Sequence, residues 1–114
     1  MTHFTGVFAT PMTPFDDDGK PALDLIDPYM AWLSASGVKG AYVLGTWGGF
    51  ALLDLDERRK VAEAYCAAAK KHNMQLLVNI ASYAIKDAIA LGHHAIEHGA
   101  DAISSVVPQY YSTA

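Results

Sequence analysis

A short segment recurs three times in this sequence, each time between a helix-like stretch and an apolar run. Its members share a residue that tolerates the left-handed conformation, then an apolar residue, a polar residue and the start of the run: Gly37-Val38-Lys39-Gly40-Ala41, Asn73-Met74-Gln75-Leu76 and Gly99-Ala100-Asp101-Ala102. Each segment ends a helix and opens a strand, so the chain alternates the two. Strands that alternate with helices pair in parallel, and the sequence therefore predicts an α/β fold with a parallel sheet.

The elements between these segments follow the same rhythm. Apolar runs predict strands at 6–10, 41–44, 76–80 and 102–107, and helical spacing of apolar residues predicts helices at 24–36, 54–71 and 85–98. Asp54 and Glu57 have the spacing of a capping box at the start of the second helix. Asn73 is expected to end that helix. Residues 1–114 are thus expected to form a single domain of four parallel strands and three helices.

Units of this kind build eightfold α/β barrels and doubly wound sheets alike, and periodicity does not choose between them. The segments after the strands are long and hold the less common residues, whereas those after the helices are short and uniform. This asymmetry is typical of folds whose working face lies at the carboxyl ends of the strands. Functional residues are therefore expected at Thr10–Thr13, Gly45–Gly49, Ala81–Tyr83 and Pro108–Thr113.

Composition excludes several classes of protein. Hydrophobic residues make up 52% of the chain, which requires a buried core, yet no apolar run approaches the ~20 residues needed to cross a bilayer. Twelve acidic and eight basic residues give a formal charge of −4, and the basic ones are scattered, so neither nucleic acid nor a membrane is an expected partner. The first residues carry no secretory leader, and the single Cys66 cannot form an internal disulfide, so we expect a cytoplasmic protein.

The turn Gly45-Thr46-Trp47-Gly48-Gly49 is the first candidate site. Its glycines leave backbone amides uncovered beside one hydroxyl, which is what a carboxylate or phosphate needs at a strand-to-helix turn. It lacks the Lys of a P-loop and the spacing of a dinucleotide fingerprint, which argues against a nucleotide site. A tight turn that merely requires glycine explains the same residues, so both interpretations stay open.

Two further groups of residues are candidates. Pro108-Gln109-Tyr110-Tyr111 places two phenols at the carboxyl end of a strand, where they can relay protons, bind a substrate or cover a neighbouring subunit. His94 and His98 share a helical face at i and i+4, a metal-ligand spacing. The sequence shows no third ligand, so a solvated helix face is preferred and no metal site is expected. The acidic segment 16–19 lacks the EF-hand pattern and is interpreted as a turn.

These motifs together resemble one known family. The matching residues, in order, are Gly6-Val7, Thr13-Pro14-Phe15, Gly45-Thr46-Trp47-Gly48-Gly49, Asp56-Glu57-Arg58-Arg59, His98-Gly99-Ala100-Asp101-Ala102 and Pro108-Gln109-Tyr110. Their order and spacing resemble the dihydrodipicolinate synthase and N-acetylneuraminate lyase family. The resemblance implies a (β/α)8 TIM barrel whose enzymes join or cleave carbon–carbon bonds through a Schiff base between a lysine and pyruvate or another 2-oxo acid. It also implies a homo-oligomer that needs no metal or organic cofactor.

The resemblance implies roles for individual residues. Thr46 matches the first hydroxyl residue of the family's Gly-(Thr/Ser)-Thr-Gly-Glu turn, which belongs to a proton relay. Tyr110 matches a tyrosine that, in dihydrodipicolinate synthases, reaches across a dimer interface into the partner's site. Gly48 matches the small position where amides approach the 2-oxo acid carboxylate. Trp47 stands where a second Thr normally holds that carboxylate, and Gly49 stands where Glu is usual, so the pocket is expected to depart from the family's.

The family's Schiff-base lysine lies on a sixth strand, and its second relay tyrosine on a fifth. The lysines of this chain fall in loops, on predicted helices or ahead of a strand: Lys20, Lys39, Lys60, Lys70, Lys71 and Lys86. A lysine on an outer helix stays solvated and protonated, so none of them is expected to form an imine. We therefore expect this chain alone to be inactive.

Three interpretations remain. In the first, residues 1–114 are the amino-terminal half-barrel of a lyase or aldolase that acts on a small 2-oxo acid, and they assemble as a homo-oligomer or with a complementary half-barrel. In the second, the half-barrel is catalytically silent and serves as an assembly or binding module. The third, a small flavodoxin-like binding domain, requires an open sheet with helices on both faces. The position of the helices separates the third interpretation from the other two.

Overall fold

Three helices of this protein end in the same way. In the computed structural model, which describes residues 2–107, the permissive residues Gly37, Asn73 and Gly99 take the left-handed conformation, with φ of 91°, 52° and 101°. The amide of the following residue donates to the carbonyl five positions earlier, in the pairs Val38 with Leu33, Met74 with Ala69, and Ala100 with Ala95. This is the Schellman closure of a helix. The predicted helix ends are confirmed.

The polar residue after each closure begins the pairing of the next strand. The amides of Lys39, Gln75 and Asp101 donate to carbonyls of the preceding unit, at 2.9, 3.0 and 2.9 Å. Each of these residues therefore fixes where its strand meets the strand before it. Helix termination and strand register are set within three consecutive residues.

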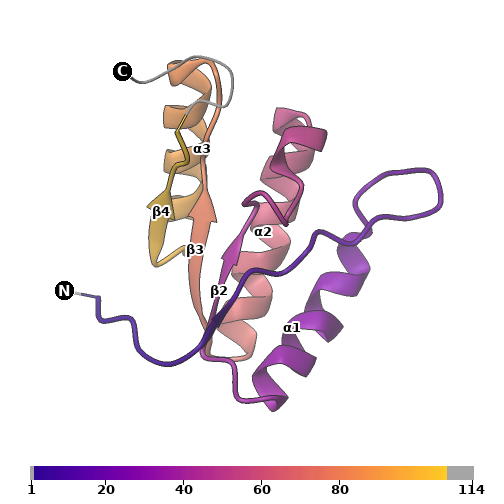
Figure 1. The fold of residues 1–114 in the computed structure, drawn as a ribbon, viewed down its shortest axis with the longest axis vertical. Coiled ribbons are helices and arrows are strands. Elements are labelled where there is room, and N and C mark those ends of the chain that lie inside the picture. The colour runs from indigo at the N-terminus through magenta and orange to yellow at the C-terminus, as the bar shows by residue number, and fades with distance from the viewer. Residues whose placement is uncertain (1, 108–114) are drawn as a thin grey trace.

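The strands form one parallel sheet in chain order (Figure 1). Their bounds are Phe8–Ala9 for β1, Gly40–Val43 for β2, Gln75–Asn79 for β3 and Ala102–Ser104 for β4. The predicted strand at 102–107 is too long. Ser104 pairs with Asn79, where β3 ends, so the apolar residues beyond Ser104 find no β3 backbone to pair with.

The helices all cover one face of the sheet (Figure 1), and α2 packs between α1 and α3. Their bounds are Ile26–Ala35 for α1, Leu55–Lys71 for α2 and Ile85–Glu97 for α3, with single 3₁₀ turns η1 at Leu23–Leu25 and η2 at Phe50–Leu52. Right-handed crossovers place every helix on the same side when the strand order never reverses. A doubly wound sheet with helices on both faces is therefore excluded.

The predicted capping box opens α2. The Asp54 carboxylate accepts from the Glu57 amide at 2.8 Å, and the Glu57 carboxylate accepts from the Asp54 amide at 3.1 Å. The two side chains satisfy amides that a helix start would otherwise leave without partners. The long central helix thus begins at a defined residue directly after the candidate turn.

The core lies between the sheet and the helices. Its largest fully buried apolar side chains come from the first two helices, the two central strands and the residue directly after β2: Ile26, Met30, Val43, Leu44, Val61, Tyr65 and Leu76. Cys66 is part of this core, and desolvation there raises the pKa of its thiol to about 11. Tyr42 and Leu77 pair in register on the opposite face of the sheet and are only half-buried. No helix within residues 2–107 is long and apolar enough to span a membrane.

Candidate functional site

The carboxyl ends of β2 and β3 are joined by a buried asparagine. Asn79 is 1% exposed, and its side-chain amide donates to the Leu44 carbonyl at 2.8 Å while its carbonyl oxygen accepts from the Ala81 amide at 3.2 Å. Leu44 has φ of 58°, a conformation that costs a non-glycine residue about 1 kcal/mol. The bond from Asn79 helps to hold the chain in this conformation, which directs it into the turn after β2.

Gly48 lies buried in that turn with no room for a side chain. A Cβ there would stand 2.8 Å from the Cα and from the amide nitrogen of Leu44, which are backbone atoms that cannot move aside alone. The Thr13 hydroxyl, 5% exposed, donates to the Gly48 carbonyl at 2.6 Å. The segment after β1 therefore holds the turn through the Thr13 hydrogen bond. This bond and the close approach to Leu44 fix the backbone conformation of the turn at Gly48.

This shape leaves hydrogen-bond donors free. Gly49 donates to the Thr46 carbonyl at 3.1 Å, but the amides of Trp47 and Gly48 donate to no backbone carbonyl within residues 2–107. Thr46 and Trp47 are exposed beside them. Consecutive amides without acceptors form a favourable place for an anionic oxygen. The backbone amides of Trp47 and Gly48 can therefore bind a carboxylate. The hydroxyl of Thr46, the residue before Trp47, belongs to the same turn.

A buried arginine lies beneath the neighbouring loop. Arg58 of α2 is 4% exposed, and its guanidinium donates to the carbonyls of Ala81 at 2.6 Å and Asn79 at 3.0 Å. The same group lies 5.3 Å from the centre of the Phe50 ring. Desolvation lowers the pKa of Arg58, but a guanidinium stays charged at any physiological pH. It places a fixed positive charge at the carboxyl edge of the sheet, which attracts anions.

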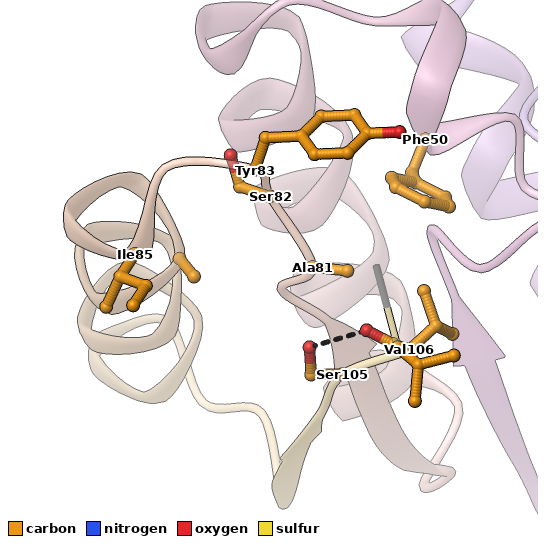
Figure 2. A pocket seen from close by; sticks show the side chains of 9 residues that line it. Phe50, Ala81, Ser82, Tyr83, Ile85, Ser105 and Val106 are labelled. Atoms are coloured by element: carbon orange, nitrogen blue, oxygen red, sulfur yellow. Dashed lines mark hydrogen bonds between the residues drawn. The ribbon is translucent and has the colours of Figure 1, made fainter. Parts of the chain in front are cut away.

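A cavity of about 200 Å³ opens beside the turn, at the ends of β3 and β4 (Figure 2). It is lined mainly by apolar groups, with hydroxyls from two serines and a tyrosine: Phe50, Ala81, Ser82, Tyr83, Ile85, Ala88, Ser105, Val106 and Val107. Figure 2 shows Tyr83 reaching toward Phe50, which comes from the turn after β2. Typical ligand pockets exceed ~300 Å³, so this one suits a small molecule.

The residues that the resemblance singled out lie in different places. Thr46 and Trp47 are exposed on the turn, Trp47 at 70%, and neither lines the cavity. Gly48 is buried with its carbonyl bonded to Thr13. Tyr110, with the segment Pro108–Tyr111, lies outside the described residues. The proposed roles of these residues therefore stay predictions.

Sequence reasoning assigned no role to Asn79 or Arg58, although both hold the site together. Asn79 is a buried polar residue that directly follows the apolar run 76–78 of β3, and Arg58 stands in the first turns of a helix whose core-facing residues are otherwise apolar. A buried polar side chain requires hydrogen-bond partners, so a polar residue at a core position is a detectable signal. Nothing in the local pattern says which carbonyls it will meet.

The interpretation of the histidines as a solvated face fits His93 and His98, which are exposed, but not His94, and a carboxylate that the sequence pattern did not reveal lies beside His94 and His98. His94 is only 14% exposed, and its Nε2 lies 2.8 Å from Oε1 of Glu63 on α2. His98 Nε2 lies 3.6 Å from the same carboxylate oxygen. Glu63 is distant in sequence and comes close only because α2 and α3 pack side by side.

None of the six lysines lies on a strand, and none lines the cavity at the ends of β3 and β4. Lys60, Lys70 and Lys71 are on α2 and Lys86 is on α3, while Lys20 and Lys39 precede α1 and β2. Lys71 pairs with Asp27 at 2.8 Å, and Lys60 pairs with Asp56 at 3.0 Å. Both of these ammonium groups are more than half exposed, which favours the protonated form.

Comparison with known proteins identifies relatives over nearly the whole chain. The model of the "Dihydrodipicolinate synthetase family" matches residues 3–114. An N-acetylneuraminate lyase of Danio rerio is 37% identical over 112 residues, which are 97% of this chain and 36% of that protein. The chain thus spans about a third of the length of the curated relatives that it matches.

Solved structures agree with the fold described above. An N-acetylneuraminate lyase from Proteus mirabilis superposes with a TM-score of 0.91 at 34% identity, over 97% of this chain and 37% of that one. YagE from E. coli K12, a prophage protein of the dihydrodipicolinic acid synthase family whose structure contains pyruvate, superposes with a TM-score of 0.91 at 26% identity, over 99% of this chain and 38% of its own. The four strands and three helices therefore correspond to part of those proteins.

Proposed function

Since this chain belongs to the dihydrodipicolinate synthetase family, we propose that its turn at 45–49 binds the carboxylate of pyruvate or another small 2-oxo acid in a lyase or aldolase that works through a Schiff base. The observation that carries the proposal is the pair of amides at Trp47 and Gly48, which donate to no backbone carbonyl within residues 2–107, on a turn held by hydrogen bonds from Thr13 and Asn79. The pyruvate in YagE supports the class of ligand.

Each part of the turn has a distinct task in this proposal. The amides of Trp47 and Gly48 hold the carboxylate, and the buried charge of Arg58 adds to the attraction. The Thr46 hydroxyl, exposed at the same turn, passes a proton to or from the bound molecule. The imine-forming amine comes from outside the strands described here, because none of the six lysines lies on a strand or lines the cavity. Tyr110, which the family resemblance matches to a tyrosine that reaches across a dimer interface into the partner's site, is a second catalytic residue in this proposal.

The proposal is tested by amide NMR during a titration with pyruvate. We expect the largest shifts at the amides of Trp47 and Gly48, because hydrogen bonding to a carboxylate changes the shielding of the donor proton. Propionate has the same carboxylate and no ketone, so it should move the same amides and leave the Thr46 signals unchanged. Shifts confined to other residues, or none at saturating pyruvate, would refute a carboxylate site at this turn.

A second candidate function is an assembly module, in which the same half-barrel has no chemistry of its own. Its support is the apolar surface at β4, which is at the edge of the described sheet: Ile103 and Val107 are 43% and 70% exposed, and the cavity beside them is mainly apolar. Such an edge favours pairing with a second copy or with a complementary half-barrel. Sedimentation at micromolar concentration tests this: association supports the module, and a well-folded monomer contradicts it.

A further inference from the structure

Two neighbouring helices bring three metal-ligating side chains together on the outer layer of the fold. Glu63 belongs to α2, and His94 and His98 belong to α3, yet one ligand atom from each lies within 4.8 Å of the others. His94 Nε2 and His98 Nε2 stand 2.8 and 3.6 Å from Glu63 Oε1. The centres of the two imidazole rings lie 4.2 Å apart, with the ring planes tilted by 37°. All three groups therefore face one small volume.

These spacings suit a tetrahedral metal ion. Nitrogen and oxygen ligands bind zinc at about 2.1 Å, so two of them at a tetrahedral angle lie ~3.4 Å apart. The two observed distances to Glu63 fall on either side of this value. Because Glu63 and His98 are 46% and 42% exposed, small side-chain rotations can close the remaining differences without moving a helix.

His98 is already oriented as a ligand. Its Nδ1 lies 2.8 Å from the His94 carbonyl, and since a carbonyl only accepts, Nδ1 carries the proton of the neutral ring. Its Nε2 lies 3.6 Å from the Glu63 carboxylate oxygen. A backbone carbonyl that fixes the tautomer of a histidine is a common second partner in metal sites.

His94 determines how tightly such an ion is held. Its Nε2 donates to Glu63 in the ion-free protein, which leaves Nδ1 as a buried acceptor with no partner among the described residues. A metal at Nε2 moves the proton to Nδ1, where this N–H has no acceptor. The lost second partner weakens binding by ~10–100-fold relative to a fully supported site, so this site is expected to bind more weakly than a site whose histidines all have second partners.

We propose that Glu63, His94 and His98 form a binding site for a divalent transition metal of the zinc type, with water completing the coordination. Two imidazoles and one carboxylate favour zinc and its neighbours over magnesium or calcium, which prefer all-oxygen sites. The ion would clamp α2 to α3. The cluster lies between helices rather than at the carboxyl ends of the strands, so the proposal is independent of the 2-oxo acid site.

Competition titration of the purified protein with zinc and a chromophoric chelator tests the proposal. We expect one equivalent of zinc bound, and at least ~10-fold weaker binding in Glu63→Gln and in His98→Gln. The control is His93→Gln, which changes an exposed histidine of the same helix outside the cluster and should titrate like the unaltered protein. The buried Cys66 thiol, with its raised pKa, does not compete at neutral pH.

Two results would overturn the site. One is no saturable zinc uptake at micromolar concentration, and the other is equal affinity in the Glu63 and His98 variants and the parent. Long-range proton–nitrogen NMR gives a second readout, because zinc should move the His94 proton from Nε2 to Nδ1. An unchanged His94 tautomer at full occupancy would also contradict the assigned ligands.

Discussion

The side-chain amide of Asn79 donates to the backbone carbonyl of Leu44 across 2.8 Å, so a single buried residue links the last residue of β3 to the left-handed start of the turn after β2. β3 thereby helps to fix the conformation of the turn after β2. Changes at β3 are for this reason expected to affect the carboxylate site that lies after β2.

Replacing Asn79 should destabilise the fold strongly. Asn79→Ala leaves the Leu44 carbonyl and the Ala81 amide without their side-chain partner, at a combined cost of about 3 kcal/mol in the free energy of unfolding. Urea denaturation measures the loss. Ser36→Ala is the control, because the exposed Ser36 hydroxyl bonds only to the Trp32 carbonyl and should cost under ~0.5 kcal/mol. Equal losses in the two variants would contradict the linking role of Asn79.

Replacing Gly48 should destabilise the fold through a steric clash in the turn, and not only through the reduced backbone freedom of the new residue. The Cβ of Gly48→Ala would stand 2.8 Å from Leu44 backbone atoms, and we expect a loss of ~2 kcal/mol together with weaker pyruvate binding. Gly37→Ala is the control: its φ of 91° is strained for alanine, but the space around it is open, so ~1 kcal/mol and unchanged binding are expected. Urea denaturation measures the stability loss in each variant, and calorimetric titration measures its affinity for pyruvate. Pyruvate affinity that survives Gly48→Ala would argue against a role for this turn.

Trp47 can be exchanged for the hydroxyl that its position usually carries in this family. The indole is 70% exposed, so Trp47→Thr should change the unfolding free energy by less than ~0.5 kcal/mol. A threonine hydroxyl offers the 2-oxo acid carboxylate one more donor, and on the proposed function pyruvate should bind ~1 kcal/mol more tightly in a full-length version. Calorimetric titration of both forms measures the difference. Unchanged or weaker binding by the threonine form counts against a carboxylate at this turn.

Asp27 should make stability depend on acid pH. Hydrogen bonds from Lys71 and then His72 lower the pKa of Asp27 below its ordinary 3.8 in the folded chain. The folded state therefore binds the proton less readily than the unfolded state, so the stabilisation is complete above about pH 4 and declines as the pH falls through the folded pKa. Asp27→Asn should lower the urea midpoint at about pH 7 and much less at about pH 3. Asp17→Asn, in the turn before α1, is the control, and it should shift neither midpoint. If the difference in urea midpoint between Asp27→Asn and the parent stays constant with pH, the ion pair of Asp27 does not contribute as expected.

The 114-residue chain by itself should not form an imine with pyruvate. Its six lysines lie on helices, in a loop or before a strand, and hydrogen bonding to Asp56 even raises the pKa of Lys60, which keeps it protonated. Borohydride reduction in the presence of pyruvate, followed by intact-mass measurement, should detect no stoichiometric adduct. A Schiff-base aldolase treated in parallel shows that the reduction works. One fully modified lysine in this chain would refute the prediction.

Sequence reasoning predicted the alternation of elements well because the relevant signals are local. The capping box of Asp54 and Glu57 and the left-handed Asn73 each depend on residues within one helical turn. The length of β4 did not follow from its own residues, because it is set by where β3 ends at Asn79. The number of residues that a strand pairs depends on the length of the neighbouring strand, here β3 for β4.

In the candidate site, too, local features could be predicted from the sequence and contacts between distant residues could not. The glycine-rich turn was identified from spacing, but its supports come from residues distant in sequence, such as Thr13 beneath Gly48. Glu63 and His94 are 31 residues apart, and no periodicity within either helix links them. Contacts of this kind depend on how helices pack, which a single sequence does not encode in any short pattern.

The repeated Schellman ends have a consequence for how such a chain can be rearranged. Each strand-and-helix unit carries its own stop at Gly37, Asn73 or Gly99, and the residues directly after that stop attach the next strand. The junctions are therefore interchangeable in their backbone hydrogen bonding, whatever side chains the units carry elsewhere. Gene duplication or recombination that cuts at these junctions would join units without a new turn having to arise, which makes them natural borders for exchanging segments among barrels of this family.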